Sequence, residues 1–468
     1  MIAMFSSKSQ IQETLLVIFF IAIVCSSALT RIDLPAFWDE PKIYIGPLFA
    51  YAENLALYFS EVSSYDRPLG TYLLYWPAVK LLGPSVLLVR VMSLSFFVAG
   101  LVLLYLQLRR FDRTAALTSL AIISVTTLFL VYAPQFVGDP QLFFLFSLYG
   151  YLLSSPKKPL AMMFILGLFI GFYRESGLAL VPATGLYWWS ERRKISLQEV
   201  FVVFAPLGGG GMHLLRNYLL SGEFFPHVII ASGSLDLLTG PAIRWRHFAG
   251  SLISSYQLWP LAITSGCLAC VRKSSRPKIG SYDLFAIGLV VCFVVVFTSM
   301  KISLPRYFMS AVPFMIYLLV RMSVSTLRGA QQLVLAGGLV LLSFASGICR
   351  FPMIPSSYSI ANQDSFEYPA MIEKHRGAIK KLRASVPPGA VVMTSWPFLE
   401  MLRREHLGYG AVVKYQYAYR AYVPAAMLWT DFPEQIPRAE IEKNLARAKY
   451  SQFDFSYGRY KVYLYIKD

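Results

Sequence analysis

The chain has 468 residues, of which 56% are hydrophobic and only 15% charged, and its mean hydropathy is +0.53. A soluble protein of this length would carry about 25% charged residues, so the composition excludes a soluble multidomain protein. The net charge of +17 would indicate nucleic-acid binding only if the basic residues gathered on a soluble face. They fall instead in loops between apolar stretches, so no nucleic acid is expected as a partner.

Apolar stretches recur over the first three quarters of the chain. Crossing a hydrocarbon core of ~30 Å takes roughly 20 mostly apolar residues per helix, although tilted or thinned regions accept fewer. The sequence therefore predicts an α-helical polytopic membrane protein with about 11 transmembrane helices. The predicted spans are 15–29, 86–108, 116–132, 142–153, 160–172, 178–189, 200–220, 248–271, 284–298, 305–320 and 333–348.

Basic residues set the predicted orientation. With the N-terminus in the cytoplasm, the clusters at 109–113, 157–158, 192–194, 272–278 and 321–328 all lie on the inner side, as the positive-inside rule requires. The first apolar stretch, between Lys8 and the small residues Ser26 to Ala28, also resembles a cleaved signal peptide. A retained anchor preserves the alternation and is the preferred interpretation. Eleven crossings then place the C-terminal region on the outer side, in a periplasm-like or luminal space.

Two regions are expected on this outer face. The first outer loop, about 31–84, contains the aromatic-rich apolar stretches 43–51 and 72–82, which are typical of helices at the level of the lipid headgroups. Residues 351–468 are too polar to cross the membrane. A helical run near 372–382 and a strand at 391–394 predict a small soluble α/β domain there. The expected division is therefore a transmembrane domain at 1–350 and a soluble domain at 351–468.

Acidic residues occur at the base of two outer loops. Asp39 and Glu40 follow the first span directly, next to two aromatic residues; partial desolvation would raise their basicity and suit a general base. Both could instead cap a helix N-terminus. Asp139 precedes Pro140 at the start of the fourth span, where it could likewise be an ordinary N-cap before proline. Neither motif alone decides between a site and a cap.

Cations on the outer face run against the inward bias of the other basic residues. They are Arg67, Arg174 (followed by Glu175), Lys301 and Arg306. Charges at the membrane edge commonly mark a ligand or a pathway, and arginine offers a planar fork that matches phosphate oxygens. Each could separately be a side chain that snorkels to the headgroups. As a set they favour binding of an anion, most naturally a phosphate.

The order of these motifs carries a family resemblance. Asp39-Glu40, the stretch from Arg67 to Tyr72, Gly138-Asp139-Pro140, Arg174-Glu175-Ser176-Gly177 and the weaker pair Arg306-Tyr307 follow in the expected sequence and topology. The chain resembles the polyprenyl-phosphate-sugar glycosyltransferases of the GT-C superfamily, in the branch with bacterial aminoarabinose (lipid A) transferase and protein O-mannosyltransferases. It departs from that pattern with Arg67 in place of the commoner lysine, and with Tyr173-Arg174 in place of Thr-Lys.

The resemblance implies a GT-C fold, an outer α/β domain and a set of roles. Asp39 would be the general base and Asp139 would support the acceptor or the electrostatics of the site. The leaving lipid phosphate, such as undecaprenyl phosphate, would be held by Arg67, Arg174, Lys301 and Arg306, and the substrate contacted by Glu40, Tyr72 and Glu175. The acceptor would be a lipid, glycan or protein. No nucleotide cofactor is implied; a divalent cation near Asp39 and Asp139 is left open. Asp39, Arg67, Asp139 and Arg174 are expected to converge.

Two other function classes fit parts of the sequence. A transporter or flippase for a lipid-linked saccharide should show broken helices or an internal repeat; the closest feature is the run Gly208 to Gly211, which helix packing explains equally well. His213 and Arg216 follow that run and are candidates for a role in a cavity. A membrane scaffold would not need acids at two loops. The five cysteines (Cys25, Cys267, Cys270, Cys292 and Cys349) are expected to be buried small apolar residues.

Overall fold

The structure is a computed structural model. It describes residues 2–36, 40–60, 67–191, 195–224, 245, 249, 256, 258–271, 278–299, 305–324, 327, 329–349, 368–394, 398–418, 421, 423–430, 438–456 and 461–468, without the side chains of 2–9, 269–271, 299 and 347–349. Asp39 and Lys301, two of the expected site residues, lie outside the described residues.

The chain forms two compact units. Unit 1 comprises Met1–Thr30, Ala56–Leu74 and Val91–Ser359, and unit 2 comprises Arg31–Leu55, Tyr75–Arg90 and Ile360–Asp468. The change of unit near residue 359 lies close to the expected boundary at 350. Two parts of the first outer loop, however, belong to the same unit as the C-terminal region.

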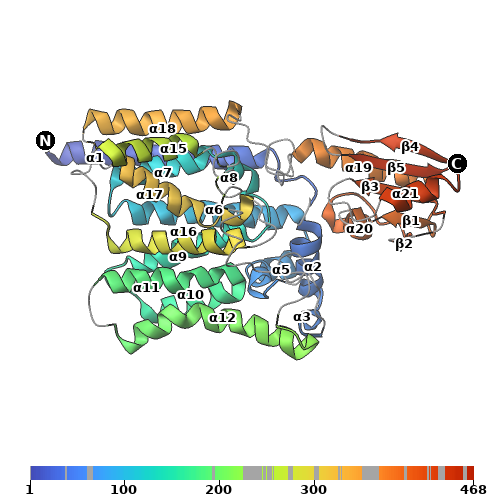
Figure 1. Ribbon diagram of the computed structural model, residues 1–468, viewed down its shortest axis with the longest axis horizontal. Helices are drawn as coiled ribbons and strands as arrows, with labels where there is room; N and C mark the ends of the chain where they lie inside the picture. The colour runs from blue at the N-terminus through green and yellow to red at the C-terminus, as the bar shows by residue number, and fades with distance from the viewer. Residues whose placement is uncertain are drawn as a thin grey trace. The chain divides into compact units, whose positions relative to one another are not determined.

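Unit 1 is built from helices in its described residues (Figure 1). Three helical stretches are long and apolar enough to cross a membrane, namely Gln10–Leu29, Val86–Leu108 and Ser281–Thr298, and the other apolar helices are shorter. The count of about eleven crossings therefore stays a prediction. The helices of unit 1 are α1 (Ile2–Leu29), α3 (Ala56–Ser60), α4 (Gly70–Leu73), α6 (Val86–Leu108, whose first turn belongs to unit 2), α7 (Arg113–Val125), α8 (Thr127–Tyr132), α9 (Asp139–Leu153), α10 (Leu160–Tyr173), α11 (Leu180–Ser190), α12 (Leu197–Ser221), α15 (Trp259–Val271), α16 (Ser281–Ser299), α17 (Val312–Val324) and α18 (Ala330–Cys349), with the 3₁₀ turns η2 (Glu175–Ala179) and η4 (Pro305–Phe308).

Two predicted spans are interrupted. The span 116–132 breaks between α7 and α8 because Thr126 is extended, at φ −74° and ψ 119°, and its hydroxyl donates back to the carbonyl oxygen of Ile122 at 2.7 Å. The span 305–320 begins as the 3₁₀ turn η4 and becomes α-helical only at Val312. Apolar composition alone did not reveal either interruption, because hydroxyl back-bonding and a short 3₁₀ turn leave the hydropathy unchanged.

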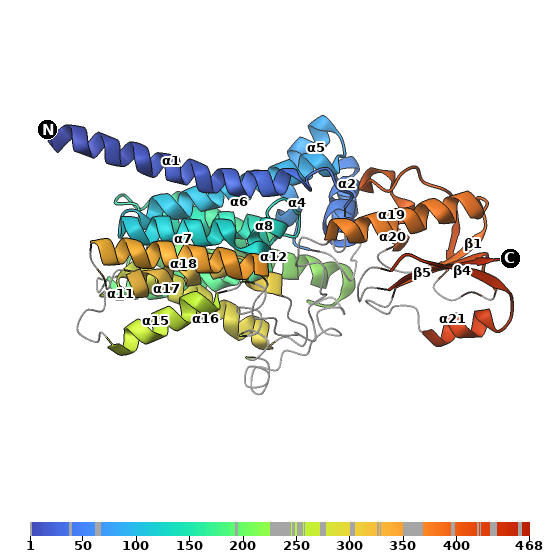
Figure 2. The same cartoon turned by 90° about the horizontal axis from the view of Figure 1, so that it is seen from above.

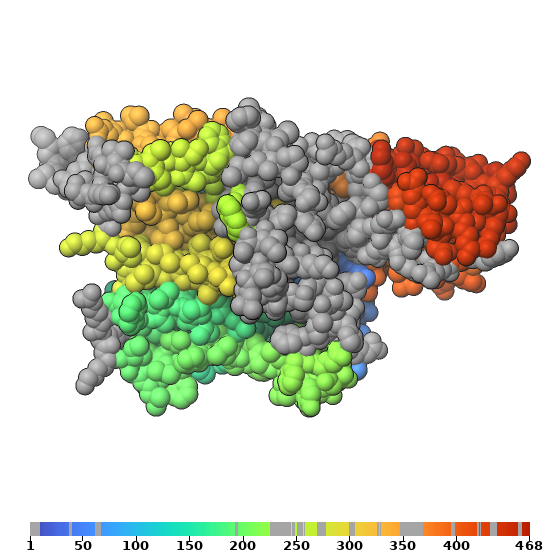
Figure 3. All heavy atoms as spheres, viewed as in Figure 1, coloured from blue at the N-terminus to red at the C-terminus, as the bar shows by residue number. Residues whose placement is uncertain are grey.

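Helices α10 and α12 are in backbone contact. A Cβ atom added to Gly209 would lie 1.9 Å from the carbonyl oxygen of Leu168, and one added to Gly171 would lie 1.9 Å from that of Pro206. Only glycine permits this approach. The glycine run thus serves helix packing, as the sequence analysis allowed. The outward side of α12 carries exposed Phe201, and the helix contributes to the green surface in Figure 3.

The first helix lies along α7, as both ribbon views show (Figure 2). Glu13 of α1 is buried and forms ion pairs of 3.0 Å with Arg109 and 2.7 Å with Arg113. The expectation of buried cysteines was wrong for the three that the structure describes: Cys25 and Cys292 are partly exposed and Cys267 is exposed. These thiols lie on the outer sides of apolar helices, which in a membrane protein meet lipid instead of a protein core.

Unit 2 contains the predicted α/β domain. Its elements are the π-helix η1 (Glu40–Ile45), α2 (Gly46–Glu53), α5 (Trp76–Leu82), α19 (Tyr368–Ser385), β1 (Val391–Thr394), α20 (Phe398–Arg403), η5 (Glu405–Leu407), β2 (Gln416–Ala418), β3 (Ala426–Thr430), α21 (Arg438–Leu445), β4 (Tyr450–Asp454) and β5 (Val462–Lys467). The strands form one sheet in the order β2-β1-β3-β5-β4, with β1 parallel to β2 and β3 and the remaining pairs antiparallel. The expected strand at 391–394 and the helix around 372–382 are confirmed.

Each face of this sheet has an apolar cover. Met393, Met427 and Tyr465 form a buried cluster with Ile441 of α21. On α19 the buried positions recur every three or four residues, which is the pattern of a helix with one apolar face. The first outer loop joins unit 2 through Arg404, whose Nη1 donates to the carbonyl oxygen of Gly46 at 2.9 Å. The helices expected in that loop are present, and their place at the headgroups stays a prediction.

Candidate active site

Asp139 lies at the first position of α9, behind a left-handed glycine. Gly138 is the N-cap with φ 80°, and no side chain caps this helix end. The carboxylate of Asp139 is 1% exposed and its Oδ1 lies 2.5 Å from Nη1 of Arg174. Among the described residues, Oδ2 has no hydrogen-bond partner. The geometry therefore excludes the ordinary N-cap interpretation and makes Asp139 part of a buried ion pair.

Three arginines interact with this one carboxylate. Arg174 forms the ion pair with Asp139, and Arg306 and Arg67 also act electrostatically on its carboxylate. Arg174 is 6% exposed, Arg306 is 2% exposed and Arg67 is partly buried. Arg174, Arg306 and Arg67 thus concentrate positive charge from three separate segments around Asp139. Guanidinium groups gathered in this way are suited to bind an anion.

The Arg67 segment is held against the end of α10. A Cβ atom on Gly70 would lie 2.6 Å from the carbonyl oxygen of Phe172, so glycine is required for the close approach. The buried hydroxyl of Thr71 donates to the carbonyl oxygen of Tyr173 at 2.5 Å, and the Tyr173 hydroxyl donates to that of Gly138 at 3.2 Å. This chain of contacts brings the segments of Arg67, Arg174 and Asp139 together from separate parts of the sequence.

Arg306 reaches the same place from η4. The Tyr256 hydroxyl donates to the carbonyl oxygen of Pro305 at 2.8 Å, which fixes the start of that turn. The hydroxyl of Ser310, just after the turn, donates to the backbone oxygen of Asp139 at 3.1 Å. The guanidinium of Arg306 lies 5.5 Å from the ring centre of Tyr307. The weak sequence pair Arg306-Tyr307 thus belongs to the arginine cluster.

Two further expected residues lie on the same segments. Glu175 opens η2 with its side chain 33% exposed, and its Oε1 lies 4.0 Å from Nε2 of His213. Tyr72 in α4 is 1% exposed. The exposure of Glu175 is compatible with substrate contact, whereas the ring of Tyr72 is enclosed and supports the Arg67 segment from within.

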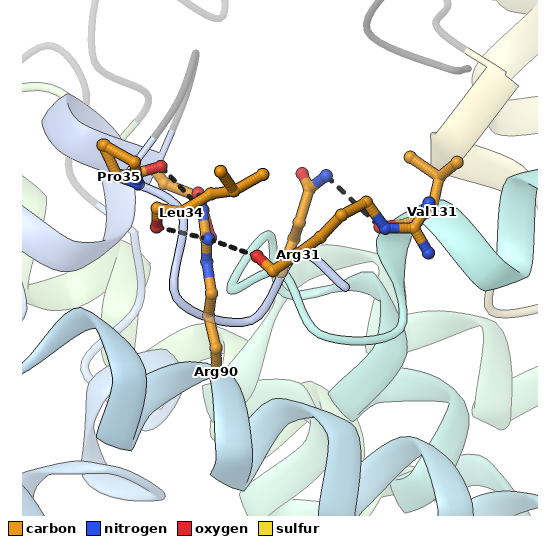
Figure 4. A network of polar contacts seen from close by, with 7 residues as sticks. Arg31, Leu34, Pro35, Arg90 and Val131 are labelled. Atoms are coloured by element: carbon orange, nitrogen blue, oxygen red, sulfur yellow. Dashed lines mark hydrogen bonds and ion pairs between the residues drawn. The ribbon is translucent and has the colours of Figure 1, made fainter. Parts of the chain in front are cut away.

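Glu40, in unit 2, is enclosed as well. It forms an ion pair of 2.7 Å with Arg90, and both side chains are 0% exposed. Arg90 also donates to the carbonyl oxygens of Arg31, Leu34 and Pro35, at 3.0, 2.5 and 2.9 Å (Figure 4). One guanidinium therefore binds backbone oxygens at residues 31–35 and the carboxylate of Glu40, on either side of residues 37–39. The ion pair leaves Glu40 no accessible surface for the substrate contact expected of it.

Comparison with known proteins places this arrangement in a familiar fold. No protein-family model and no curated protein matches the sequence. Two solved structures, ArnT from Cupriavidus metallidurans bound to undecaprenyl phosphate and the same protein in the apo state, each match with a TM-score of 0.54 and 14% sequence identity. The match covers 96% of this chain and 97% of ArnT. This chain has the ArnT fold. The GT-C resemblance read from the sequence is confirmed at the level of the fold.

The ArnT fold and the apolar helices make the chain an integral membrane protein. The divalent cation left open near Asp39 and Asp139 stays a prediction, because Asp39 lies outside the described residues. The described residues contain no group of three histidines, cysteines or carboxylates that could hold a metal ion.

Several residues in this ArnT fold were missed by the sequence analysis. Arg90 was included in an apolar span, although a lone arginine in such a span is itself a signal of function or of a buried partner. Tyr58 was counted only among the aromatic residues of the first loop. Asn217 was not noticed, although its spacing of one and four residues from Arg216 and His213 places the three side chains close together on a helix.

Proposed function

We propose that the chain is a glycosyltransferase that moves a sugar from a polyprenyl-phosphate-linked donor to a hydroxyl group of a lipid, glycan or protein. The reaction would take place on the periplasmic side of a bacterial inner membrane. The observation that carries this proposal is the buried cluster of Arg67, Arg174 and Arg306 around Asp139. The cluster is suited to bind an anion and lies in an ArnT fold, and the ArnT of Cupriavidus metallidurans was solved bound to undecaprenyl phosphate.

In the proposed reaction the acceptor hydroxyl attacks the anomeric carbon of the donor. Asp39, assigned as base from the sequence resemblance, takes the hydroxyl proton as the new bond forms. The bond between the anomeric carbon and the phosphate oxygen breaks, and the phosphate leaves with the electron pair on the opposite side. The configuration at the anomeric carbon is therefore inverted.

The arginine cluster acts on the leaving group. Arg67, Arg306 and Arg174, together with Lys301, neutralise the charge that grows on the lipid phosphate as the bond breaks. These guanidinium groups are held in place before the substrate arrives, so little reorganisation is needed during the reaction. Asp139 orients Arg174 through the 2.5 Å contact. Glu175, which is partly exposed, is assigned to the substrate.

The decisive experiment uses the purified full-length protein in lipid nanodiscs with a panel of polyprenyl-phosphate sugars and candidate acceptors. We expect release of polyprenyl phosphate with transfer of the sugar, loss of transfer in Asp39→Asn, and weaker donor saturation in Arg67→Ala. Arg110→Ala is the matched control, because Arg110 pairs with Ser154 and Tyr151 away from the cluster. Near-normal transfer by folded Asp39→Asn would refute the assignment of the base. Movement of intact donor across vesicles without cleavage would support a flippase instead.

A further inference from the structure

A second buried polar cluster lies next to the Arg67 segment, on α12. His213, Arg216 and Asn217 are 2%, 8% and 0% exposed. Their spacing of three and four residues places them on one side of the helix. They follow the glycines that bring α12 against α10, so this side of α12 faces the segments that carry Arg174 and Glu175.

His213 and Arg216 both contact Tyr58 of α3. Arg216 donates from Nε to the backbone oxygen of Tyr58 at 2.9 Å, and its guanidinium lies 4.1 Å from the centre of the Tyr58 ring. His213 Nδ1 lies 3.1 Å from the Tyr58 hydroxyl. That same hydroxyl oxygen accepts the backbone N–H of Leu69 at 3.0 Å. Helix α12 thus contacts both the backbone oxygen and the hydroxyl of Tyr58. The same hydroxyl binds the backbone of Leu69, two residues after Arg67.

The network fixes the proton on His213. Arg216 has only donors, so its 2.9 Å contact with Asn217 requires the amide oxygen of Asn217. The amide nitrogen of Asn217 then points at Nε2 of His213, at 3.2 Å. This nitrogen can only donate, so Nε2 must accept and the proton of the neutral ring lies on Nδ1. Nδ1–H therefore donates to the Tyr58 hydroxyl.

We propose that neutral His213 is a positioning residue that, through Tyr58, holds the Arg67 segment in the form that binds the donor phosphate. This inference rests on the proposed function. His213 acts on Leu69 through one phenolic oxygen, and Leu69 is two residues from the guanidinium that would contact the phosphate. Loss of this link lets the segment move and weakens donor binding, while the reacting atoms and the base are untouched.

Protonation of His213 breaks the arrangement. A proton on Nε2 would oppose the amide N–H of Asn217, and the carboxylate of Glu175 lies 4.0 Å from Nε2. In the part of the chain that the structure describes, the charged and titratable groups of this network are Glu175 of η2, Arg216 of α12 and Tyr58 of α3. An imidazolium attracted to Glu175 would turn away from Asn217 and Tyr58. Donor binding should therefore weaken when the pH falls far enough to protonate His213.

The kinetic test measures KM and kcat for the donor between pH 5 and 7.5, with acceptor saturating. A sugar phosphodiester does not titrate in this range, so the donor contributes no pH dependence of its own. For the wild type we expect KM to rise about 3- to 10-fold on acidification, the size of one lost hydrogen bond, with kcat nearly constant. In His213→Asn the amide still donates to Tyr58 but cannot be protonated, so KM should be independent of pH. His213→Leu should raise KM at every pH.

A double-mutant cycle and a control complete the kinetic test. Tyr58→Phe should raise KM by a similar factor and add nothing to His213→Leu, because both remove the same link. Met212→Ala is the matched control, since Met212 neighbours His213 but is 58% exposed; its KM should equal that of the wild type. Identical pH profiles for the wild type and His213→Asn, or additive effects in the double variant, would overturn the proposal.

A second measurement does not depend on sugar transfer. Hydrogen exchange of the full-length protein in detergent reports the protection of the Leu69 amide. His213→Leu and Tyr58→Phe should each speed exchange in the peptide that covers 67–73, whereas Met212→Ala should not. Unchanged exchange in both variants would refute the link. If both variants exchange faster but the wild type neither transfers sugar nor binds polyprenyl phosphate, the link between His213 and Leu69 is supported and the proposed function is refuted.

Discussion

Repulsion between the Asp139 carboxylate and a bound phosphate predicts that removing this carboxylate strengthens anion binding. In Asp139→Asn the three arginines that act on this position lose the negative charge of the carboxylate. Without ligand the variant should be less stable than the wild type, because breaking a buried ion pair from one side costs about 3–5 kcal/mol. With polyprenyl phosphate bound, the missing repulsion between carboxylate and phosphate should offset part of that loss.

The size of the effect follows from the geometry. Nη1 of Arg174 lies 2.5 Å from the Asp139 carboxylate, so a phosphate on the far side of the guanidinium would lie roughly 6 Å from that carboxylate. At an effective dielectric constant of about 20, two unit charges at this separation repel by about 3 kcal/mol. Taking this value as an upper bound, we expect undecaprenyl phosphate to bind Asp139→Asn about 10- to 100-fold more tightly. Slower release of that product should lower kcat.

The assay is calorimetric titration of the full-length protein in nanodiscs with undecaprenyl phosphate, together with thermal unfolding at increasing ligand concentration. Asp283→Asn is the matched control, because Asp283 is also buried and is paired with Arg321 and Tyr317. Asp283 lies in the first turn of α16, whereas η4 follows the last turn of that helix. The control variant should lose stability without gaining affinity. Unchanged or weaker binding to folded Asp139→Asn, or an equal gain in Asp283→Asn, would refute the reasoning.

Three predictions concern stability. Arg90→Met removes five donors from a buried site and should destabilise unit 2 by about 3–5 kcal/mol, whereas Glu40→Gln should cost about 1–3 kcal/mol; chemical denaturation compares them. Burial lowers the pKa of His375 to about 3, whereas the histidine of the unfolded chain takes up its proton near pH 6.5. The free energy of unfolding is therefore full above about pH 6.5 and decreases by about 1.4 kcal/mol per pH unit as the pH falls towards 3. Protection factors of the sheet amides should show this loss in the wild type and not in His375→Leu. Gly209→Ala places Cβ against a carbonyl oxygen of α10 and should lower the melting temperature, while Gly211→Ala, with open space around it, should not.

The sequence revealed the parts of this molecule that depend on composition and local pattern. Span 86–108 and strand 391–394 agree with α6 and β1 to the residue, because a long and mostly apolar run and a short run rich in β-branched residues are each set by local residues. The grouping of Arg67, Arg174 and Arg306 was anticipated from their shared outer face. The ion pair of Glu40 with Arg90 was not, since Arg90 is fifty residues away and only the fold brings the two side chains together.

What separates the arginine cluster from the other buried charges is how each charge is compensated. Glu13 pairs with Arg109 and Arg113, but these two arginines are 41% and 45% exposed and their excess charge is screened by solvent. Asp283 pairs with Arg321, one charge against one, with a further hydrogen bond from Tyr317. At Asp139 three arginines act on one carboxylate, and two of them are almost fully enclosed, so solvent screens their charge less. An anion bound there would therefore interact more strongly than one bound at the exposed arginines beside Glu13.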